Sequence, residues 1–354
     1  MRDISSATNR LLPGKATAPL SVEKARDEEP SILAAPDRAN ADRVLLGFRD
    51  FDEAAIQKKI KANLSQEVAL LMKFSPEQQG RYEKIVHALP ATDPEARLSL
   101  QRLLLDGKLL EAKDKKGEGT LLDNLSKLAD QRLEENINRG ELLSDVVQEV
   151  ENPVCIAQEG KGTCGASTVQ IMLASENPAE YARLISGLAS PEGKTTLANG
   201  EEIARKPGTE MEDGALRTVS TRLLVPAFME YGNGMATYDN EKDKSSLMGV
   251  SYPGLTYGDF ARLAEGVLNR SFEVKKSGLF NDAGDLLKQV ARLASPSSHV
   301  PLVIDYPGLG FHAVQVTEVK EGRVNYINPW GRLESLGEEA FTAKLKGVLL
   351  PDSP

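Results

Sequence analysis

Apolar residues recur at intervals of three and four positions between residues 51 and 150, which predicts a series of amphipathic helices. The segment 75–78, SPEQ, has the form of a capping box with proline at the first helical position, and Thr92 or Asp93 opens the next helix. We therefore expect an all-helical module over residues 51–150. Its histidine, His87, falls on an amphipathic helix, where a packed or surface role is the natural interpretation.

The pattern changes after Asn152. Small and apolar residues predict a first helix there, further periodicity predicts two amphipathic helices, and alternating positions predict strands. The last two strands are separated by the turn sequence KEG, which is typical of a hairpin. A segment that begins with helices and ends with antiparallel strands is typical of an α+β domain, which we expect over residues 151–354. The expected helices are 165–175, 256–270 and 282–294, and the expected strands are 271–276, 300–306, 311–319 and 323–329. Residues 194–251 are rich in glycine and charge, which predicts long surface loops.

Residues 1–50 are rich in Ser, Ala, Pro, Asp and Arg with little apolar periodicity, so we expect a disordered or weakly ordered segment. The N-terminal sequence lacks the apolar stretch of a secretory signal peptide, and no run approaches the roughly 18 apolar residues of a membrane span. We expect no membrane insertion. Two locations fit: the cytoplasm, or secretion without a Sec signal peptide through a specialised secretion system, as bacterial effectors are exported.

The composition limits the classes of molecule that we expect the chain to bind. The chain of 354 residues is 40% hydrophobic and 27% charged, with a formal net charge of -9 spread over both halves. Without a basic face to neutralise phosphates, nucleic acid is excluded as the expected partner. Two cysteines and three scattered histidines give no zinc-ligand spacing, so we predict no metal and no cofactor.

One cysteine has an unusual setting. Cys164 follows a glycine-containing approach in QEGKGTCGAST and precedes the first helix of the second domain. A helix N-terminus favours the thiolate, which is the nucleophilic form, and Gly160, Gly162 and Gly165 allow close backbone approach. The alternative is that Cys164 is a buried small hydrophobe. Cys155 is interpreted as a buried thiol, with a reversible disulfide to Cys164 as the other option.

A histidine and an asparagine on the predicted hairpin supply the partners that a nucleophilic thiol needs. His312 begins one strand and Asn328 ends the next, so the hairpin brings the amide oxygen within reach of the imidazole. An amide suffices to orient the base because the expected pair is a thiolate and an imidazolium. Two rivals could orient His312 instead: Asp305 on the preceding strand, and Asn325, which we expect on the same strand face as Asn328. His299 is interpreted as a surface or loop residue.

These residues resemble the papain-like cysteine peptidases. Gln158, Cys164, His312 and Asn328 occur in that family's order, and the spacing of Cys164 and His312 lies within the roughly 130–150 residues typical of it. The stretch 328–331, NPWG, is most similar to the calpain version and contains Trp330, the chain's one tryptophan. The resemblance covers residues 154–168 and 299–332. It departs from the family at 166–168, where AST replaces the usual nearby aromatic residue and second cysteine.

The resemblance implies a role for each of these residues. Cys164 would be the nucleophile, His312 the base and Asn328 its orienting group. Gln158 would donate its side-chain amide to the oxyanion, and Trp330 would cover the His–Asn hydrogen bond. Substrate contacts are expected at Gly162, Thr163, Gly165, Phe311 and Trp330.

The expected fold is a papain-like domain, with a helical lobe and an antiparallel sheet lobe, behind the helical module. The expected function is a thiol-dependent peptidase or amide hydrolase that acts on a protein or peptide substrate through a covalent thioester. Two alternatives stay open, a transglutaminase-like acyltransferase and a non-catalytic binding module with a vestigial protease fold. The module at 51–150 is expected to inhibit the catalytic domain, to bind a partner protein, or to recruit substrate.

Overall fold

The structure is a computed structural model that describes residues 31–32, 53–111 and 113–352. The prediction of weak order for residues 1–50 therefore lies almost entirely outside the described residues. Within that segment only Ser31 and Ile32 are described, and they form the short strand β1 (Ser31–Ile32).

The first half of the described chain is helical, as the periodicity predicts. Ser75 caps its helix with a complete capping box, and the side chain of Asp93 rather than that of Thr92 accepts from the amide of Ala96. Helix α2 packs against α4, and α3 packs against α6. These helices are α2 (Glu53–Leu71), α3 (Pro76–Ala88), α4 (Pro94–Leu105), α5 (Lys108–Glu111), α6 (Leu121–Asp130) and α7 (Arg139–Glu151).

A second group of helices follows α7 and packs on it directly. It consists of α8 (Cys164–Glu176), α9 (Pro178–Ala189), α10 (Val219–Asn233) and α11 (Tyr257–Leu268), with the 3-10 turn η1 (Pro153–Cys155) between α7 and α8. Helix α7 contacts α8, α9 and α10. Buried side chains such as Val147 on α7 and Val169 on α8 belong to one hydrophobic core that crosses the predicted domain boundary at residue 150.

The prediction of long surface loops over 194–251 is wrong. Helix α10 lies in this segment and is almost entirely buried, with Thr218 as its N-cap. Two small antiparallel sheets flank it: β2 (Lys194–Thr196) with β3 (Glu202–Ala204), and β4 (Thr237–Asp239), β5 (Lys244–Leu247) and β6 (Val250–Tyr252). The segment's overall content of glycine and charge hid the short apolar run within α10, which tertiary packing buries.

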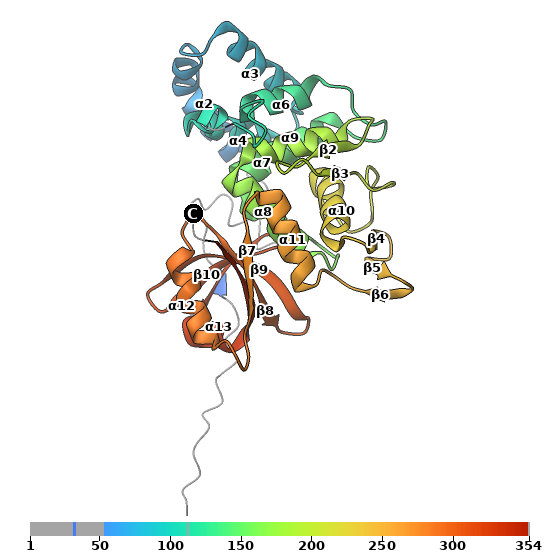
Figure 1. Cartoon of the computed structure of the whole chain (residues 1–354). Helices are drawn as coiled ribbons and strands as arrows, with labels where there is room; N and C mark the ends of the chain where they lie inside the picture. Colours follow the sequence, from blue (N-terminus) through green and yellow to red (C-terminus); the bar gives the residue numbers. More distant parts are fainter. Residues whose placement is uncertain (1–30, 33–52, 112, 353–354) are drawn as a thin grey trace, which may run out of the picture.

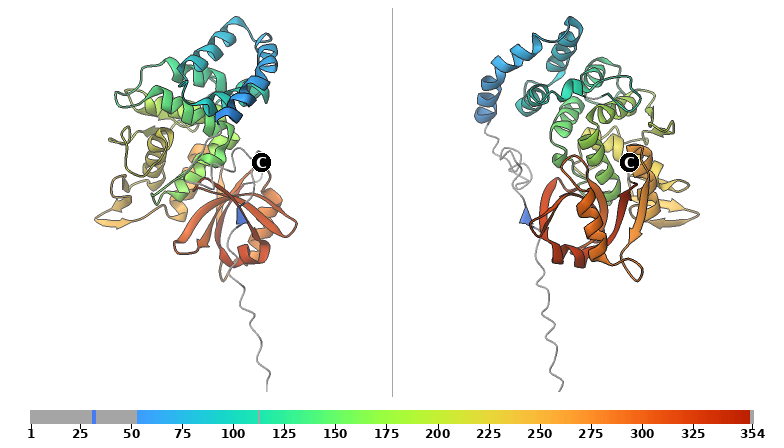
Figure 2. Two further views of the ribbon diagram at one scale, coloured as in Figure 1. Left: turned by 180° about the vertical axis from the view of Figure 1, so that it is seen from behind. Right: turned by 60° about the vertical axis from the view of Figure 1, so that its left-hand side comes forward.

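The C-terminal part contains a seven-stranded sheet in the order β1-β11-β10-β9-β8-β12-β7, with antiparallel pairing throughout. Its later strands are β7 (Phe272–Lys276), β8 (Val300–Tyr306), β9 (Gly310–Lys320), β10 (Arg323–Asn328), β11 (Arg332–Gly337) and β12 (Leu345–Pro351). The chain is thus an α+β protein, as predicted. Figures 1 and 2 show most of the helices gathered at one end of the molecule and the seven-stranded sheet at the other.

Different helices pack on the two faces of the seven-stranded sheet. Helices α12 (Ala283–Leu293) and α13 (Glu338–Lys344) enclose a separate hydrophobic core on one face. Helix α8 lies against β9 on the other face, where Ala313 and Ile327 join the core of the helices. The N-terminus of α8 is thereby brought next to the strand that carries His312 (Figure 1).

Candidate active site

The thiol of Cys164 sits at the first residue of α8, and the start of this helix has no side-chain cap. The backbone N–H groups of the first turn therefore remain available. Those of Cys164 and Gly165, together with that of Ala313 on β9, lower the pKa of the thiol. Burial has the larger effect and raises the pKa of Cys164 above its usual value.

The loop before Cys164 is held from two sides. The backbone N–H of Gln158 donates to the carbonyl of Pro329 at 2.7 Å, which joins the loop to the NPWG turn. On the other side, the N–H of Gly162 donates to Oδ2 of Asp243 at 2.6 Å. Asp243 lies just before β5, and its Oδ1 accepts the hydroxyl of Tyr238 at 2.8 Å. The negative charge of Asp243 also raises the pKa of Cys164.

His312 is buried on β9, with 3% of its surface exposed. Its Nε2 lies 2.9 Å from Oδ1 of Asn328, so Nδ1 takes no part in this bond. The same Oδ1 accepts the backbone N–H of Trp330 at 3.3 Å. On the other side of the amide, Nδ2 of Asn328 donates to Oε1 of Glu334 at 3.1 Å. These contacts assign the amide orientation, with its oxygen toward the imidazole.

Two aromatic rings enclose the imidazole. Trp330 stacks on His312 with ring centroids 4.4 Å apart and an interplanar angle of 17°. Tyr306, at the end of β8, presents its ring edge-on to His312 at 5.2 Å and to Trp330 at 5.1 Å. This enclosure removes water from the base. Burial accordingly lowers the pKa of His312, against the opposing effect of its hydrogen bond to Asn328.

Ala313 connects β9, the strand of His312, to helix α8. Its backbone N–H lowers the pKa of the Cys164 thiol, and its carbonyl accepts the hydroxyl of Thr168 on α8 at 3.3 Å. Within the described residues, no hydrogen bond joins the sulfur to the imidazole. Because burial raises the thiol pKa and lowers that of His312, the surroundings favour the neutral form of each group. This differs from the expected thiolate–imidazolium pair, because sequence gives helix position but not the depth of burial.

Gln158 is buried within the loop before Cys164, and its Nε2 donates one hydrogen to the carbonyl of Lys161 at 2.7 Å. The second hydrogen of this amide remains for another acceptor. The structure therefore brings the loop of Gln158 and Cys164 together with the His312–Asn328 pair.

The residues predicted to touch substrate have different surroundings. Phe311 is 66% exposed, next to His312 on β9, and Trp330 is partly exposed. Thr163 is fully buried, with no hydrogen-bond partner for its hydroxyl. At Gly165, a Cβ would lie 3.3 Å from Leu255 and 3.4 Å from Phe260, so its lack of a side chain serves packing of α8 against α11.

The rivals named from the sequence have other neighbours. Asp305 is exposed and lies 3.5 Å from the amine of Lys346. Asn325 is on the opposite strand face from Asn328, because side chains alternate along β10, so the expectation of a shared face is wrong. Asn325 instead lines a separate cavity of about 660 Å³ together with His299.

His299 lies in a loop, as predicted, but it is buried rather than on the surface, with 6% exposed. The turn closed by hydrogen bonds between Ser295 and Ser298 precedes it directly. Burial lowers the pKa of His299. Cys155 and Cys164 are both free thiols, so the optional disulfide between them is not formed.

Sequence reasoning missed three residues that shape the site: Asp243, Tyr306 and Glu334. Glu334 stands in the mixed sequence RLESLG, where no local pattern marks a buried carboxylate, and the one signal for Tyr306 is that it directly follows the rival Asp305. No local pattern marks Asp243, because its partner Gly162 is far away along the chain.

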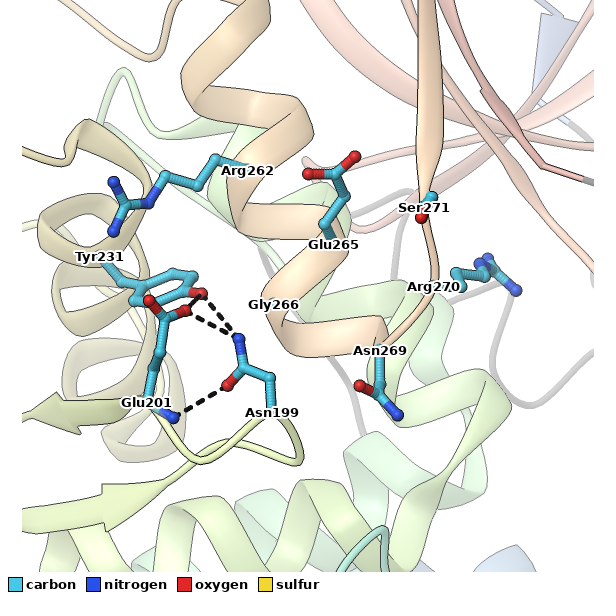
Figure 3. A pocket seen from close by; sticks show the side chains of 9 residues that line it. All are labelled: Asn199, Glu201, Tyr231, Arg262, Glu265, Gly266, Asn269, Arg270 and Ser271. Atoms are coloured by element: carbon cyan, nitrogen blue, oxygen red, sulfur yellow. Dashed lines mark hydrogen bonds between the residues drawn. The ribbon is translucent and has the colours of Figure 1, made fainter.

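The molecule also has a hollow of about 580 Å³ between α10 and α11 that contains none of the predicted site residues (Figure 3). Its charged groups have partners within the protein. Glu201 accepts from Asn199 at 2.7 Å and from the hydroxyl of Tyr231, and Arg270 pairs with Glu176 at 3.0 Å. The hollow offers no nucleophile beside a base.

No helix in the described part of the chain is long and apolar enough to cross a membrane. Comparison with known proteins gave no relative: no protein-family model matches the chain, and no curated protein matches it.

Proposed function

We propose that this chain is a thiol-dependent peptidase or amide hydrolase of the papain-like type, with Cys164 as nucleophile and His312 as base. The observation that carries the proposal is the buried His312–Asn328 pair at 2.9 Å, together with the influence of the next residue, Ala313, whose backbone N–H lowers the pKa of the Cys164 thiol. A thiol at an uncapped helix start beside an oriented imidazole is the arrangement that acyl transfer to sulfur requires.

The chemistry follows from the neutral resting pair. As the sulfur of Cys164 attacks the carbonyl carbon of a peptide or amide, Nδ1 of His312 accepts the thiol proton. Oδ1 of Asn328 accepts the Nε2–H and supports the imidazolium that forms. His312 then returns the proton to the departing amine, which leaves a thioester on Cys164. Water, deprotonated by His312, hydrolyses the thioester and restores the thiol.

Two donors are positioned for the developing oxyanion. The backbone N–H of Cys164 lies at the open start of α8, and the free amide hydrogen of Gln158 is on the neighbouring loop. In comparable sites, removal of one such donor lowers turnover by about 10²–10³.

The test is hydrolysis of a denatured protein substrate in water enriched in oxygen-18, read by mass spectrometry of the newly formed ends. We expect new carboxyl ends that carry the label with the wild-type chain and none with Cys164→Ala. Cys155→Ala is the matched control and should retain the activity, because Cys155 lies outside the site. An added primary amine distinguishes acyl transfer: products that carry the amine in place of oxygen-18 would contradict a hydrolase. Equal cleavage by wild type and Cys164→Ala would refute Cys164 as the nucleophile.

A further inference from the structure

Glu334 is a carboxylate buried behind the His312–Asn328 pair. It lies on β11 opposite Tyr326 of β10, and only 2% of its surface is exposed. Carboxylates are rarely buried without a compensating partner, because desolvation of the charge is costly. At this position Oε1 accepts two hydrogen bonds, from Nδ2 of Asn328 at 3.1 Å and from the hydroxyl of Tyr306 at 3.3 Å. The carboxylate thus contacts two groups that themselves contact the base.

The contact with Asn328 selects one of two orientations of its amide. The oxygen and nitrogen of an amide are nearly the same size, so rotation by half a turn fits the same space and exchanges acceptor for donor. A carboxylate oxygen accepts hydrogen bonds, so it stabilises the orientation in which Nδ2 points toward Glu334. Oδ1 then points toward His312 and the backbone N–H of Trp330.

The orientation of the amide determines the tautomer of the imidazole. When Oδ1 faces Nε2, the neutral ring carries its hydrogen on Nε2 and leaves a lone pair on Nδ1 for the thiol proton. In the reversed orientation Nδ2 would donate to Nε2, and the ring hydrogen would move to Nδ1. A ring protonated on Nδ1 cannot accept the proton of Cys164.

We propose that Glu334 is a positioning residue that holds the amide of Asn328 in the orientation required for the Nε2–H tautomer of His312. Its catalytic consequence rests on the proposed function, whereas the tautomer is a property of the resting protein. Tyr306 connects the two parts of this arrangement, because its hydroxyl donates to Glu334 and its ring packs edge-on against His312.

The tautomer can be measured directly. The chain has three histidines, so selective nitrogen-15 labelling of histidine gives few ring signals, and His312→Ala assigns those of His312. In the wild-type chain we expect His312 as the Nε2–H tautomer, and a resting Nδ1–H tautomer would overturn the proposal without any variant. In Glu334→Leu, which is similar in size but has no acceptor, we expect a mixture with substantial Nδ1–H. Glu334→Gln, whose amide oxygen can still accept from Nδ2, should restore the wild-type tautomer.

The values of kcat and KM for the same variants provide a second measurement. We expect Glu334→Leu to lower kcat by about 10- to 100-fold, the size of effect found when the hydrogen-bond partner behind a metal-bound imidazole is removed, with KM unchanged. Glu334→Gln should recover most of that loss. Glu339→Leu, at an exposed carboxylate on α13, is the matched control and should leave kcat unchanged.

The outcomes separate the two proposals. An unchanged tautomer and kcat in folded Glu334→Leu would overturn the role of Glu334 and leave the hydrolase proposal intact. A shifted tautomer in a chain whose wild type hydrolyses nothing would support the positioning role and refute the proposed function. Thermal unfolding identifies a variant that does not fold. Glu334→Ala, which removes the carboxyl without filling the space, then takes the place of Glu334→Leu.

Discussion

At the residue scale, the exclusion of water determines the direction in which the pKa values of the candidate site residues move. Trp330 and Tyr306 enclose the imidazole of His312, and burial moves the pKa values of His312 and Cys164 in opposite directions. The energetic cost of separating charge between the two groups in the resting protein is thereby raised. Under the proposed function, proton transfer from the thiol to the imidazole is then favourable only as the sulfur attacks, and the proposed role of His312 is that of a general base rather than of one half of a preformed ion pair.

This account predicts the acid side of the pH profile. His312 must be neutral to accept a proton, and burial lowers its pKa from the usual 6.5, so kcat/KM should persist below that pH. Trp330→Ala admits water to the ring and should raise the pKa of His312 toward 6.5, which moves the acid limb of kcat/KM to higher pH. Trp330→Phe, which keeps a stacked ring, is the control. An acid limb that stays in place or moves to lower pH in Trp330→Ala would contradict the account.

At the element scale, the loop before Cys164 is held in place by hydrogen bonds to segments that are distant in sequence. The NPWG turn after β10 receives the N–H of Gln158, and Asp243 before β5 receives that of Gly162. Without the first contact, the backbone N–H of the buried Gln158 would lose its acceptor. The second contact links the exposed Gly162 to the residue that precedes β5, so the small sheet β4-β5-β6, which the sequence did not predict, supports the loop before Cys164.

The charge of Asp243 can be tested for its effect on the thiol of Cys164. Asp243→Asn keeps an oxygen for the N–H of Gly162 and removes the negative charge that raises the pKa of Cys164. We expect that pKa to fall, so the rate of alkylation of Cys164 should reach half its maximum at lower pH. Peptide mass spectrometry separates alkylation of Cys164 from that of Cys155. A pH dependence that is unchanged, or moved upward, would count against this contact.

The features that the sequence predicted correctly are those that depend on residues close together in the chain. Helix starts at Ser75 and near Asp93 and the hairpin that ends at Asn328 could be predicted, because caps, periodicity and turns are local. Glu334 and Tyr306 reach the His312–Asn328 pair only through strand register, which local patterns do not determine. Helix α10 was missed because its apolar run lies between segments rich in glycine and charge.

At the scale of the whole molecule, the N-terminal helices share one hydrophobic core with α8, the helix that begins at Cys164. Helix α7 supplies acceptors to the start of α10: Oδ2 of Asp145 accepts the N–H of Val219 at 2.8 Å, and Glu149 accepts the hydroxyl of Ser220 at 2.7 Å. The hydroxyl of Tyr181 on α9 also donates to Glu149 at 2.7 Å. Together with the shared core, these bonds support a structural role for α7 rather than that of a removable inhibitor.

Truncation tests this role. A chain that begins at Asn152 lacks α7, exposes the apolar surfaces of α8 and α10 and leaves the amide of Val219 without its acceptor. We expect it to aggregate or to unfold without a cooperative transition, whereas the full chain unfolds cooperatively. Circular dichroism during heating provides the measurement. Cooperative unfolding of residues 152–354 near the melting temperature of the full chain would show that α7 is dispensable.

The central claim is that Cys164 is a nucleophile activated by His312. Intact-protein mass spectrometry of the full chain after exposure to a cysteine-directed epoxide tests this claim most directly. The account predicts a single adduct on Cys164 in the wild-type chain and in Cys155→Ala, none in Cys164→Ala, and much slower labelling in His312→Ala. An absence of adduct on the wild-type chain, or labelling of Cys164 at the same rate without His312, would contradict it.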